Sequence, residues 1–302
     1  MKDIAKILIE IVGAQNVKEH EPMKHHTTFR IGGEADIFVT PENTEQLISV
    51  LRVFQENDVP CFILGNGSNL LVGDKGIRGA VVQLFKNLNT ITVEGDTIIA
   101  MGGALLSALS AKAAEHGLAG LEFASGIPGT VGGATVMNAG AYGGEMKDVL
   151  VEVEVLTKGL EVITLPASAL ELSYRHSIIL QNEYIVLKAT MKLQLDDKTK
   201  IKARLSELGE KRREKQPLQY PSAGSTFKRP EGYFAGKLVE DAGLKGKRMG
   251  GAEVSTKHAG FVVNVGDATA QDVLDLIGFC QEKILQEFGV RLEAEVKMIG
   301  EF

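Results

Sequence analysis

Hydrophobic and polar positions along the chain follow helical spacing in some stretches and strand spacing in others. Leu47, Leu51 and Phe54 recur at helical spacing and predict a helix over 43–57. Residues 1–17 predict an amphipathic helix and not a signal peptide, because acidic residues interrupt the apolar positions and no small-residue cleavage site follows. Further helices are predicted over 104–116, 199–215 and 270–288.

Alternation of apolar and polar residues predicts several strands. A hairpin is predicted where 91–93 and 97–100 flank a Glu-Gly-Asp turn. The last strand, 290–298, alternates strictly, with Val290, Leu292, Ala294, Val296 and Met298 on its apolar face. Other strands are predicted over 60–64, 70–72, 149–156 and 184–195. This mixture of helices and short strands indicates an α+β protein in two or three subdomains.

Composition places the chain among ordinary globular proteins. It has 302 residues, of which 44% are hydrophobic and 24% are charged. No apolar run reaches the roughly 18 residues that a membrane span needs, so no membrane association is expected. Cys61 and Cys280 stand in apolar surroundings and are expected to be core residues of a cytoplasmic protein, without a disulfide framework or a metal site.

Charge is distributed unevenly along the chain. The net charge is −6, yet residues 200–260 carry 14 Lys and Arg against 7 Asp and Glu. A basic region in an acidic protein predicts an anionic ligand at that place. The clusters at 211–215 and 245–248 are short and lack interleaved aromatic residues, so a nucleic-acid face is not indicated. A helix C-terminus would account for 211–215 equally well.

Two glycine-rich segments stand out. Residues 121–144 hold seven glycines and almost no charge, which favours a backbone folded around a large flat or phosphorylated ligand. A buried, tightly turned core segment is the alternative. The GNGSN loop at 65–69 follows a strand, where phosphate-binding loops occur. It lacks the dinucleotide fingerprint, because Leu70 replaces the third glycine, and a simple β-turn remains open.

Three polar residues could take part in chemistry. Arg175, between a tyrosine and a histidine, could hold a carboxylate through two parallel hydrogen bonds, or it could belong to a surface loop. Ser225 lies in the basic region and could be a nucleophile, a phosphate binder, a proton donor or a structural turn residue. Ala223 and Phe227 stand where a nucleophile elbow needs glycine. Glu295 lies on the polar face of the last strand, where a solvated role is the alternative.

Taken together, these segments resemble one family, the UDP-N-acetylenolpyruvoylglucosamine reductases. The resemblance covers residues 27–296, nearly the whole chain, and the length is similar to that of the family's shorter, type II form. Seven motifs occur in order: TTFRIGG at 27–33, LGNGSNLLV at 64–72, GIPGTVGG at 126–133, NAGAYG at 138–143, YRHS at 174–177, SAGSTFK at 222–228 and HAGF at 258–261.

The resemblance implies an α+β, vanillyl-alcohol-oxidase-type fold that binds FAD noncovalently. Two FAD-binding subdomains would cover 1–78 and 79–195. A C-terminal substrate-binding domain would cover 196–302, with its last strand, 290–298, packing back toward the flavin. The residues implied in FAD binding are Arg30, Gly65, Asn66, Gly67, Ser68, Asn69, Gly126, Ile127, Pro128, Gly129, Thr130, Gly132, Gly133, Asn138 and Gly140.

The resemblance also implies the chemistry. NADPH would reduce FAD, which would pass a hydride to the enolpyruvyl ether of a UDP-sugar, giving UDP-N-acetylmuramate for peptidoglycan. Arg175 would lie beside the substrate carboxylate, Glu295 would stabilise the enolic intermediate, and Ser225 would protonate C2. No metal, nucleic acid, membrane or obligate protein partner is implied. The residues implied in substrate binding are Tyr174, Lys215, Lys228, Arg229 and His258.

The chain departs from the family at two positions, and two other functions are open. Arg229 stands where many members have asparagine, and Ala294 where many have proline. One alternative is an FAD-dependent sugar or hydroxy-acid oxidase of the same fold, with the flavin linked to His25 or His26. The other is a nucleotide-sugar-binding regulator without turnover, against which the joint presence of the three candidate catalytic residues argues.

Overall fold

The computed structural model describes residues 2–302, and the chain divides into two compact units. Unit 1 comprises the N-terminal residues up to Lys18 together with Ile37–Asn66 and Ala80–Arg212. Unit 2 comprises Glu19–Asp36, Gly67–Gly79 and Arg213–Phe302. The subdomain boundaries expected from the sequence, at 78 and 195, stay a prediction.

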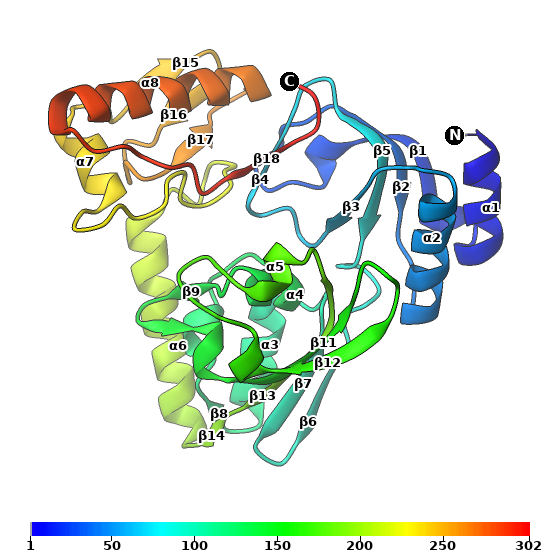
Figure 1. The fold of residues 1–302 in the computed structure, drawn as a ribbon. Helices are drawn as coiled ribbons and strands as arrows, with labels where there is room; N and C mark the ends of the chain where they lie inside the picture. The colour runs from blue at the N-terminus through cyan, green and yellow to red at the C-terminus, as the bar shows by residue number, and fades with distance from the viewer. Residues whose placement is uncertain (1) are drawn as a thin grey trace. The chain divides into compact units, whose positions relative to one another are not determined.

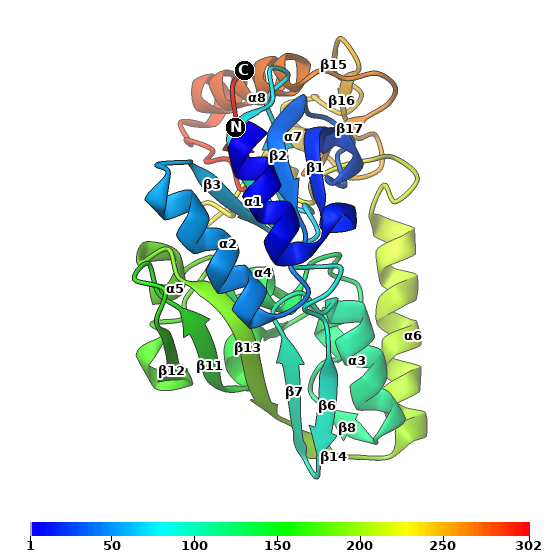
Figure 2. The ribbon, with the colours of Figure 1, turned by 90° about the vertical axis from the view of Figure 1, so that its right-hand side faces the viewer.

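Two helices near the N-terminus cover one core of unit 1. Helices α1 (Lys2–Val12) and α2 (Thr44–Glu56) lie side by side (Figure 2). Leu8, Leu47 and Phe54 are buried in that core, as the helical spacing requires. The side chain of Asn43 accepts a hydrogen bond from the Gln46 N–H at 2.8 Å and caps α2. The helix predicted at 43–57 is confirmed. The one predicted over 1–17 is helical only over Lys2–Val12, because 14–16 form a short 3-10 turn and Val17 begins a strand, and Met1 lies outside the described residues.

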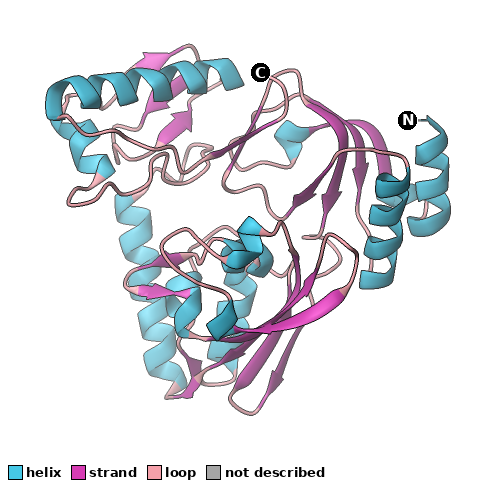
Figure 3. Cartoon of the chain, in the orientation of Figure 1, coloured by secondary structure: helices cyan, strands magenta, loops and turns pink. Residues whose placement is uncertain are grey.

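An antiparallel sheet forms the second core of unit 1 (Figure 3). Its strand order is β12-β11-β13-β7-β6. Helix α4 (Val131–Val136) contacts β13, and α3 (Leu106–Glu115) ends before Gly117. The hairpin predicted at 91–100 is confirmed by the pairing of Glu94 with Thr97. The strands are β6 (Ile91–Glu94), β7 (Thr97–Met101), β11 (Leu150–Leu156), β12 (Val162–Pro166) and β13 (Ile185–Lys192).

A second sheet has the order β1-β2-β5-β3. Within it, β3 runs parallel to β5 and pairs Leu64 with Gln83, which brings Gln83 to the start of the loop at 65–69. Its strands are β1 (Val17–Pro22), β2 (Glu34–Val39), β3 (Cys61–Leu64) and β5 (Ile77–Gln83). The shorter elements of unit 1 are β8 (Leu118–Ala119), β9 (Gly140–Ala141), β10 (Gly144–Glu145), β14 (Gln194–Leu195) and α5 (Ile178–Gln181).

In unit 2, α8 (Ala270–Phe288) packs against the sheet of order β15-β16-β17 (Figure 1). Thr269 and Asp272 form a capping box at the start of the helix predicted over 270–288, and Gly289 ends the helix with a φ of +67°. Asp74 also accepts hydrogen bonds from the first backbone N–H groups of α8. The other elements are β4 (Leu70–Val72), α7 (Ala235–Asp241), β15 (Arg248–Met249), β16 (Ala252–Val254), β17 (Val262–Asn264) and β18 (Lys297–Ile299), while α6 (Lys198–Lys215) begins in unit 1.

Two details differ from the sequence expectations. The last strand was expected over 290–298, but only Lys297–Ile299 form a ladder, parallel to β4, and Met298 is 41% exposed. The residues before it make only an isolated bridge, so most of this segment is extended chain without a regular partner. Cys280 is buried as expected, whereas Cys61 is exposed at the first position of its strand. No helix in the described residues is long and apolar enough to cross a membrane.

Candidate active site

The loop at 65–69 has a backbone that only glycine can follow at its centre. Gly67 has a φ of +63°, and a Cβ added there would overlap the carbonyl oxygen of His26. The Gly67 carbonyl also accepts a hydrogen bond from the Thr28 N–H at 3.2 Å. The loop is therefore packed backbone against backbone, and its shape depends on glycine.

The start of this loop meets the second glycine-rich segment within unit 1. The Asn66 side-chain amide donates a hydrogen bond to the Pro128 carbonyl at 2.6 Å. A Cβ at Gly65 would lie 2.5 Å from the hydroxyl oxygen of Thr130. Thr130 in turn caps α4, since its hydroxyl accepts a hydrogen bond from the Gly133 N–H. Gly65 and Asn66 thus form one cradle with residues 126–130, all within unit 1.

Two buried polar atoms beside this cradle were not foreseen from the sequence. Within residues 2–302, Gln83 Oε1 and Thr135 Oγ1 are buried and have no hydrogen-bond partner. Gln83 Nε2 donates to the carbonyl of Gly65 at 3.4 Å, and Thr135 belongs to α4. Buried polar atoms nearly always have a partner, so these two fit a site that receives a polar ligand. No motif marks either residue in the sequence.

Several candidate site residues have a strained backbone. Arg30, Asn138 and Arg175 have φ values of +56°, +41° and +54° although none is glycine. Such conformations are uncommon and concentrate at functional sites. Asn138 is buried, and its amide donates to Glu145 Oε2 at 2.6 Å and to the Ser173 carbonyl at 3.2 Å. These bonds connect the 138–143 motif to the segment that carries Arg175.

Arg175 is half-buried, and its guanidinium lies over the ring of Tyr174, with 4.9 Å between the guanidinium carbon and the ring centroid. Tyr174 itself is 53% exposed. The stacking orients the guanidinium plane against the Tyr174 ring. Both residues belong to unit 1.

Ser225 and Glu295 lie on neighbouring segments of unit 2. Phe227 and Ala294 form an antiparallel bridge, and the Glu295 N–H donates to the Thr226 carbonyl at 2.8 Å. Ala294, one of the two departures from the family, therefore occupies a bridge position without disturbing the pairing. Ser225 is exposed and Glu295 is half-buried. The backbone thus holds a hydroxyl and a carboxylate on adjacent segments.

The Glu295 segment is also tied to the loop at 65–69. The Asn69 amide donates to the Glu295 carbonyl at 3.2 Å, and the Lys297 N–H donates to the Asn69 carbonyl at 3.0 Å. Burial and, to a smaller extent, the charge of Lys228 lower the pKa of Lys297. Lys228 is ion-paired with Glu293. Lys297 is a cation that the sequence pattern did not single out.

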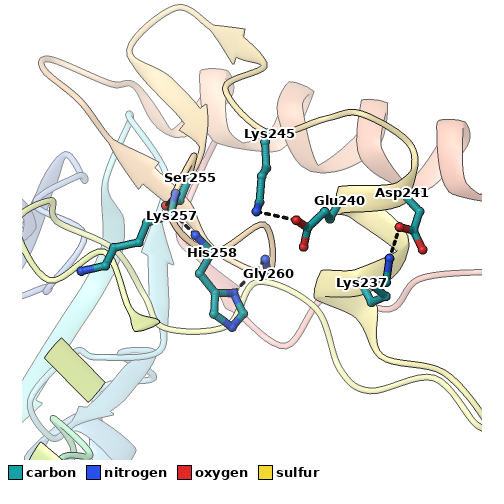
Figure 4. A network of polar contacts seen from close by, with 8 residues as sticks. All are labelled: Lys237, Glu240, Asp241, Lys245, Ser255, Lys257, His258 and Gly260. Carbon is teal, nitrogen blue, oxygen red and sulfur yellow. Dashed lines mark hydrogen bonds and ion pairs between the residues drawn. The ribbon is translucent and has the colours of Figure 1, made fainter. Parts of the chain in front are cut away.

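His258 is part of a tight turn in unit 2 (Figure 4). Its backbone N–H donates to the Ser255 hydroxyl at 3.2 Å, and its Nδ1 accepts from the Gly260 N–H at 3.1 Å. An accepting Nδ1 places the proton of the neutral ring on Nε2. Burial, and to a smaller extent the charge of Lys245, lowers the pKa of His258, while Glu240 opposes this.

This arrangement predicts a pH-dependent stability. The folded pKa of His258 lies below its unfolded value, which is near 6.5. As pH falls through that value, the unfolded chain gains a proton that the folded chain does not yet bind, so the free energy of unfolding decreases. We expect His258→Gln to lose less in Tm between pH 7.5 and pH 5.5 than the parent protein. His116→Gln, at an exposed histidine, is the control. An unchanged pH slope in His258→Gln would contradict the assignment.

The remaining candidate residues are distributed over both units. Arg30, Lys215 and Arg229 are exposed residues of unit 2. The Arg229 guanidinium lies over the Phe234 ring at 4.1 Å, so the second departure from the family places a cation on an exposed aromatic ring. His26 was considered for covalent flavin attachment, and its Nε2 is hydrogen-bonded to Glu21 Oε1 at 2.7 Å. Among residues 2–302 no three His, Cys, Asp or Glu side chains gather as metal ligands.

Comparisons with known proteins match both parts of the chain. A domain model described as "FAD binding domain" matches residues 35–165, and one described as "UDP-N-acetylenolpyruvoylglucosamine reductase, C-terminal domain" matches residues 216–299. The reductase of that name from Clostridium tetani is 54% identical over 300 residues, covering 99% of this chain and 97% of the relative.

Solved structures agree with the sequence comparisons. The crystal structure of the Thermus caldophilus reductase matches with a TM-score of 0.80 and 37% identity, covering 93% of this chain and 97% of that one. p-Cresol methylhydroxylase matches with a TM-score of 0.51 and 17% identity, covering 65% of this chain and 43% of that one. The latter likeness concerns the fold alone, and it confirms the vanillyl-alcohol-oxidase-type architecture. The chain belongs to the UDP-N-acetylenolpyruvoylglucosamine reductase family.

Proposed function

We propose that this protein reduces the enolpyruvyl ether of UDP-N-acetylglucosamine-enolpyruvate to UDP-N-acetylmuramate, a peptidoglycan precursor, with noncovalently bound FAD and with NADPH as the electron donor. The observation that carries this is the 54% identity to a named reductase over 99% of the chain. Because the substrate is a water-soluble nucleotide sugar, we place the enzyme in the cytoplasm. We propose no nucleic-acid partner, since the basic clusters are too short for a nucleic-acid-binding face.

The cradle in unit 1 fits the cofactor. A backbone without room for a Cβ at Gly65 lets N–H groups approach a diphosphate closely, and the unpartnered atoms of Gln83 and Thr135 are available to polar groups of the ligand. Arg30 and Asn138, with their strained backbones, would complete the contacts. When bound there, FAD supplies hydride transfer between the nicotinamide and the substrate.

The chain's own residues would handle the substrate's charge and proton. Arg175 binds the carboxylate through two parallel hydrogen bonds, in a site where preorganised charge stabilises the electron density that develops beside it. Glu295 helps to hold the enolic form. Ser225 gives its proton to C2. A hydroxyl has a high pKa, so this transfer requires a strongly basic carbon and a fixed hydroxyl position.

The nucleotide part of the substrate would contact the basic region. Lys215, Lys228 and Arg229 supply positive charge for its diphosphate, and His258 offers the proton on Nε2 as a donor. Tyr174 presents an exposed ring beside Arg175. The local excess of positive charge at 200–260 supports this assignment. No observation favours the oxidase or the regulator.

The visible spectrum of the purified protein tests the proposal. We expect flavin absorbance that bleaches on anaerobic addition of NADPH and returns when the enolpyruvyl nucleotide sugar is added. Acid precipitation should leave the flavin in the supernatant, because no covalent bond holds it. Flavin that stays reduced with this substrate, or that reoxidises only with oxygen, would contradict the reductase function. Flavin that precipitates with the protein would instead support the covalent oxidase.

A further inference from the structure

Arg212, near the C-terminal end of α6, is a half-buried cation without a partner. Lys211 and Arg204, its neighbours on the helix, both pair with Glu207. Arg212 forms no hydrogen bond or ion pair with any residue that the structure describes. Burial lowers the pKa of Arg212, with only the phenol of Tyr142 acting in the opposite direction. A guanidinium stays charged in a protein, so its positive charge is not neutralised by any residue between 2 and 302.

The side chain of Arg212 runs along the glycine-rich segment of unit 1. A Cβ added at Gly126 would lie 3.0 Å from Cδ of Arg212 and 3.0 Å from one of its terminal nitrogens. Two residues further on, Pro128 accepts the hydrogen bond from Asn66 of the 65–69 loop. Arg212 thus lies against the segment that contacts the start of this loop.

A charge that is partly removed from water and left unpaired reduces stability. A ligand anion would offset that cost, and the planar guanidinium fork matches a phosphate. The cradle beside Gly126 is the place where the backbone excludes side chains and leaves buried polar atoms unpartnered. An anion bound there would meet the Arg212 guanidinium.

We infer that Arg212 binds the diphosphate of a nucleotide ligand held by the Gly65–Pro128 cradle, and that this ligand is FAD. The inference rests on the proposed function, because it needs a flavin nucleotide in unit 1. Two sources of a diphosphate exist, FAD and the UDP-sugar. FAD is favoured because Arg212, Gly126 and the start of the loop, Gly65 and Asn66, belong to the same compact unit.

The test is the affinity of Arg212→Gln for each nucleotide. FAD binding to the apoprotein is followed by quenching of flavin fluorescence, and binding of the enolpyruvyl UDP-sugar to the FAD-saturated oxidised enzyme by calorimetry. We expect the Kd for FAD to rise roughly 10- to 100-fold, as for the loss of a charge-assisted hydrogen bond. We also expect a shallower dependence of log Kd on salt concentration, and partial recovery in Arg212→Lys, which keeps the charge. Arg213→Gln, one residue along and exposed, is the matched control and should bind FAD normally.

A weakened UDP-sugar affinity with normal FAD affinity would assign the diphosphate to the substrate and overturn the FAD assignment. Unchanged affinity for both nucleotides, or an equal loss in Arg213→Gln, would overturn the inference entirely. Thermal unfolding of the apoprotein separates a folding defect from a binding defect. Because Arg212→Gln removes an unpaired charge, its apoprotein should be at least as stable as the parent. If the parent protein itself bound no FAD, the proposed function would fail and not this inference alone.

Discussion

Ser225→Ala is expected to slow oxidation of the reduced enzyme by the enolpyruvyl substrate roughly 10²–10⁴-fold, the usual contribution of a general acid. Reduction of the flavin by NADPH should stay nearly unchanged, because no proton from Ser225 is needed in that half-reaction. The hydroxyl is exposed and makes no hydrogen bond to the described residues, so its removal should not disturb the fold.

Stopped-flow absorbance measures the rates of flavin reduction by NADPH and of flavin reoxidation by the substrate separately. Ser222→Ala, three residues earlier in the same segment, is the matched control and should leave both rates intact. If Ser225→Ala slows both half-reactions equally, the residue shapes the loop and does not donate the proton.

Gly67→Ala is expected to abolish stoichiometric FAD binding, with the Kd weakened at least about tenfold, or about 1.4 kcal/mol. The added Cβ would overlap the His26 carbonyl, so the loop must move away from the shape that lets its N–H groups approach a diphosphate. The ratio of flavin absorbance to protein absorbance after gel filtration measures the loss.

Gly95→Ala is the control for Gly67→Ala, because it introduces the same backbone strain without the overlap. Gly95 has the same φ of +63°, but a Cβ there would meet nothing within 4 Å. It should lose about 1 kcal/mol or more in stability from the left-handed conformation and keep its flavin. Full flavin occupancy in a folded Gly67→Ala protein would mean that this loop does not hold the cofactor.

The sequence was enough to predict those helices and hairpins whose ends are marked by capping or turn residues. Helix α8 begins at a capping box between Thr269 and Asp272 and ends at Gly289, and each signal lies within one turn of the helix end that it marks. The hairpin at 91–100 is likewise defined by its turn residues. Helix α4 has no such pattern, because Gly132 and Gly133 disfavour a helix and only the cap from Thr130 and its packing stabilise it.

The candidate site residues were predicted from sequence motifs. Contacts between distant segments and site residues outside the motifs were not predicted. The contact between Asn66 and Pro128 joins segments 62 residues apart, which no periodicity reveals. Gln83 and Thr135 matter because they are buried without a partner, a property that only the packed structure can show. The roles of Arg175, Ser225 and Glu295 stay predictions that the experiments above address.

Unit 2 is assembled from three separated stretches of chain, and this has a kinetic consequence. Phe29, Leu71 and Leu276 come from the three stretches and share one hydrophobic core. Closing contacts over such sequence distances costs chain entropy and slows folding. During synthesis on the ribosome, the apolar side chains of residues 19–36 and 67–79 cannot be buried in the core of unit 2 until residues 213–302 have been made. The long continuous stretch 80–212 of unit 1 has no such delay. The apolar side chains of these two early segments therefore stay exposed until the last part of the chain has been made, and exposed apolar surface of this kind is prone to aggregation.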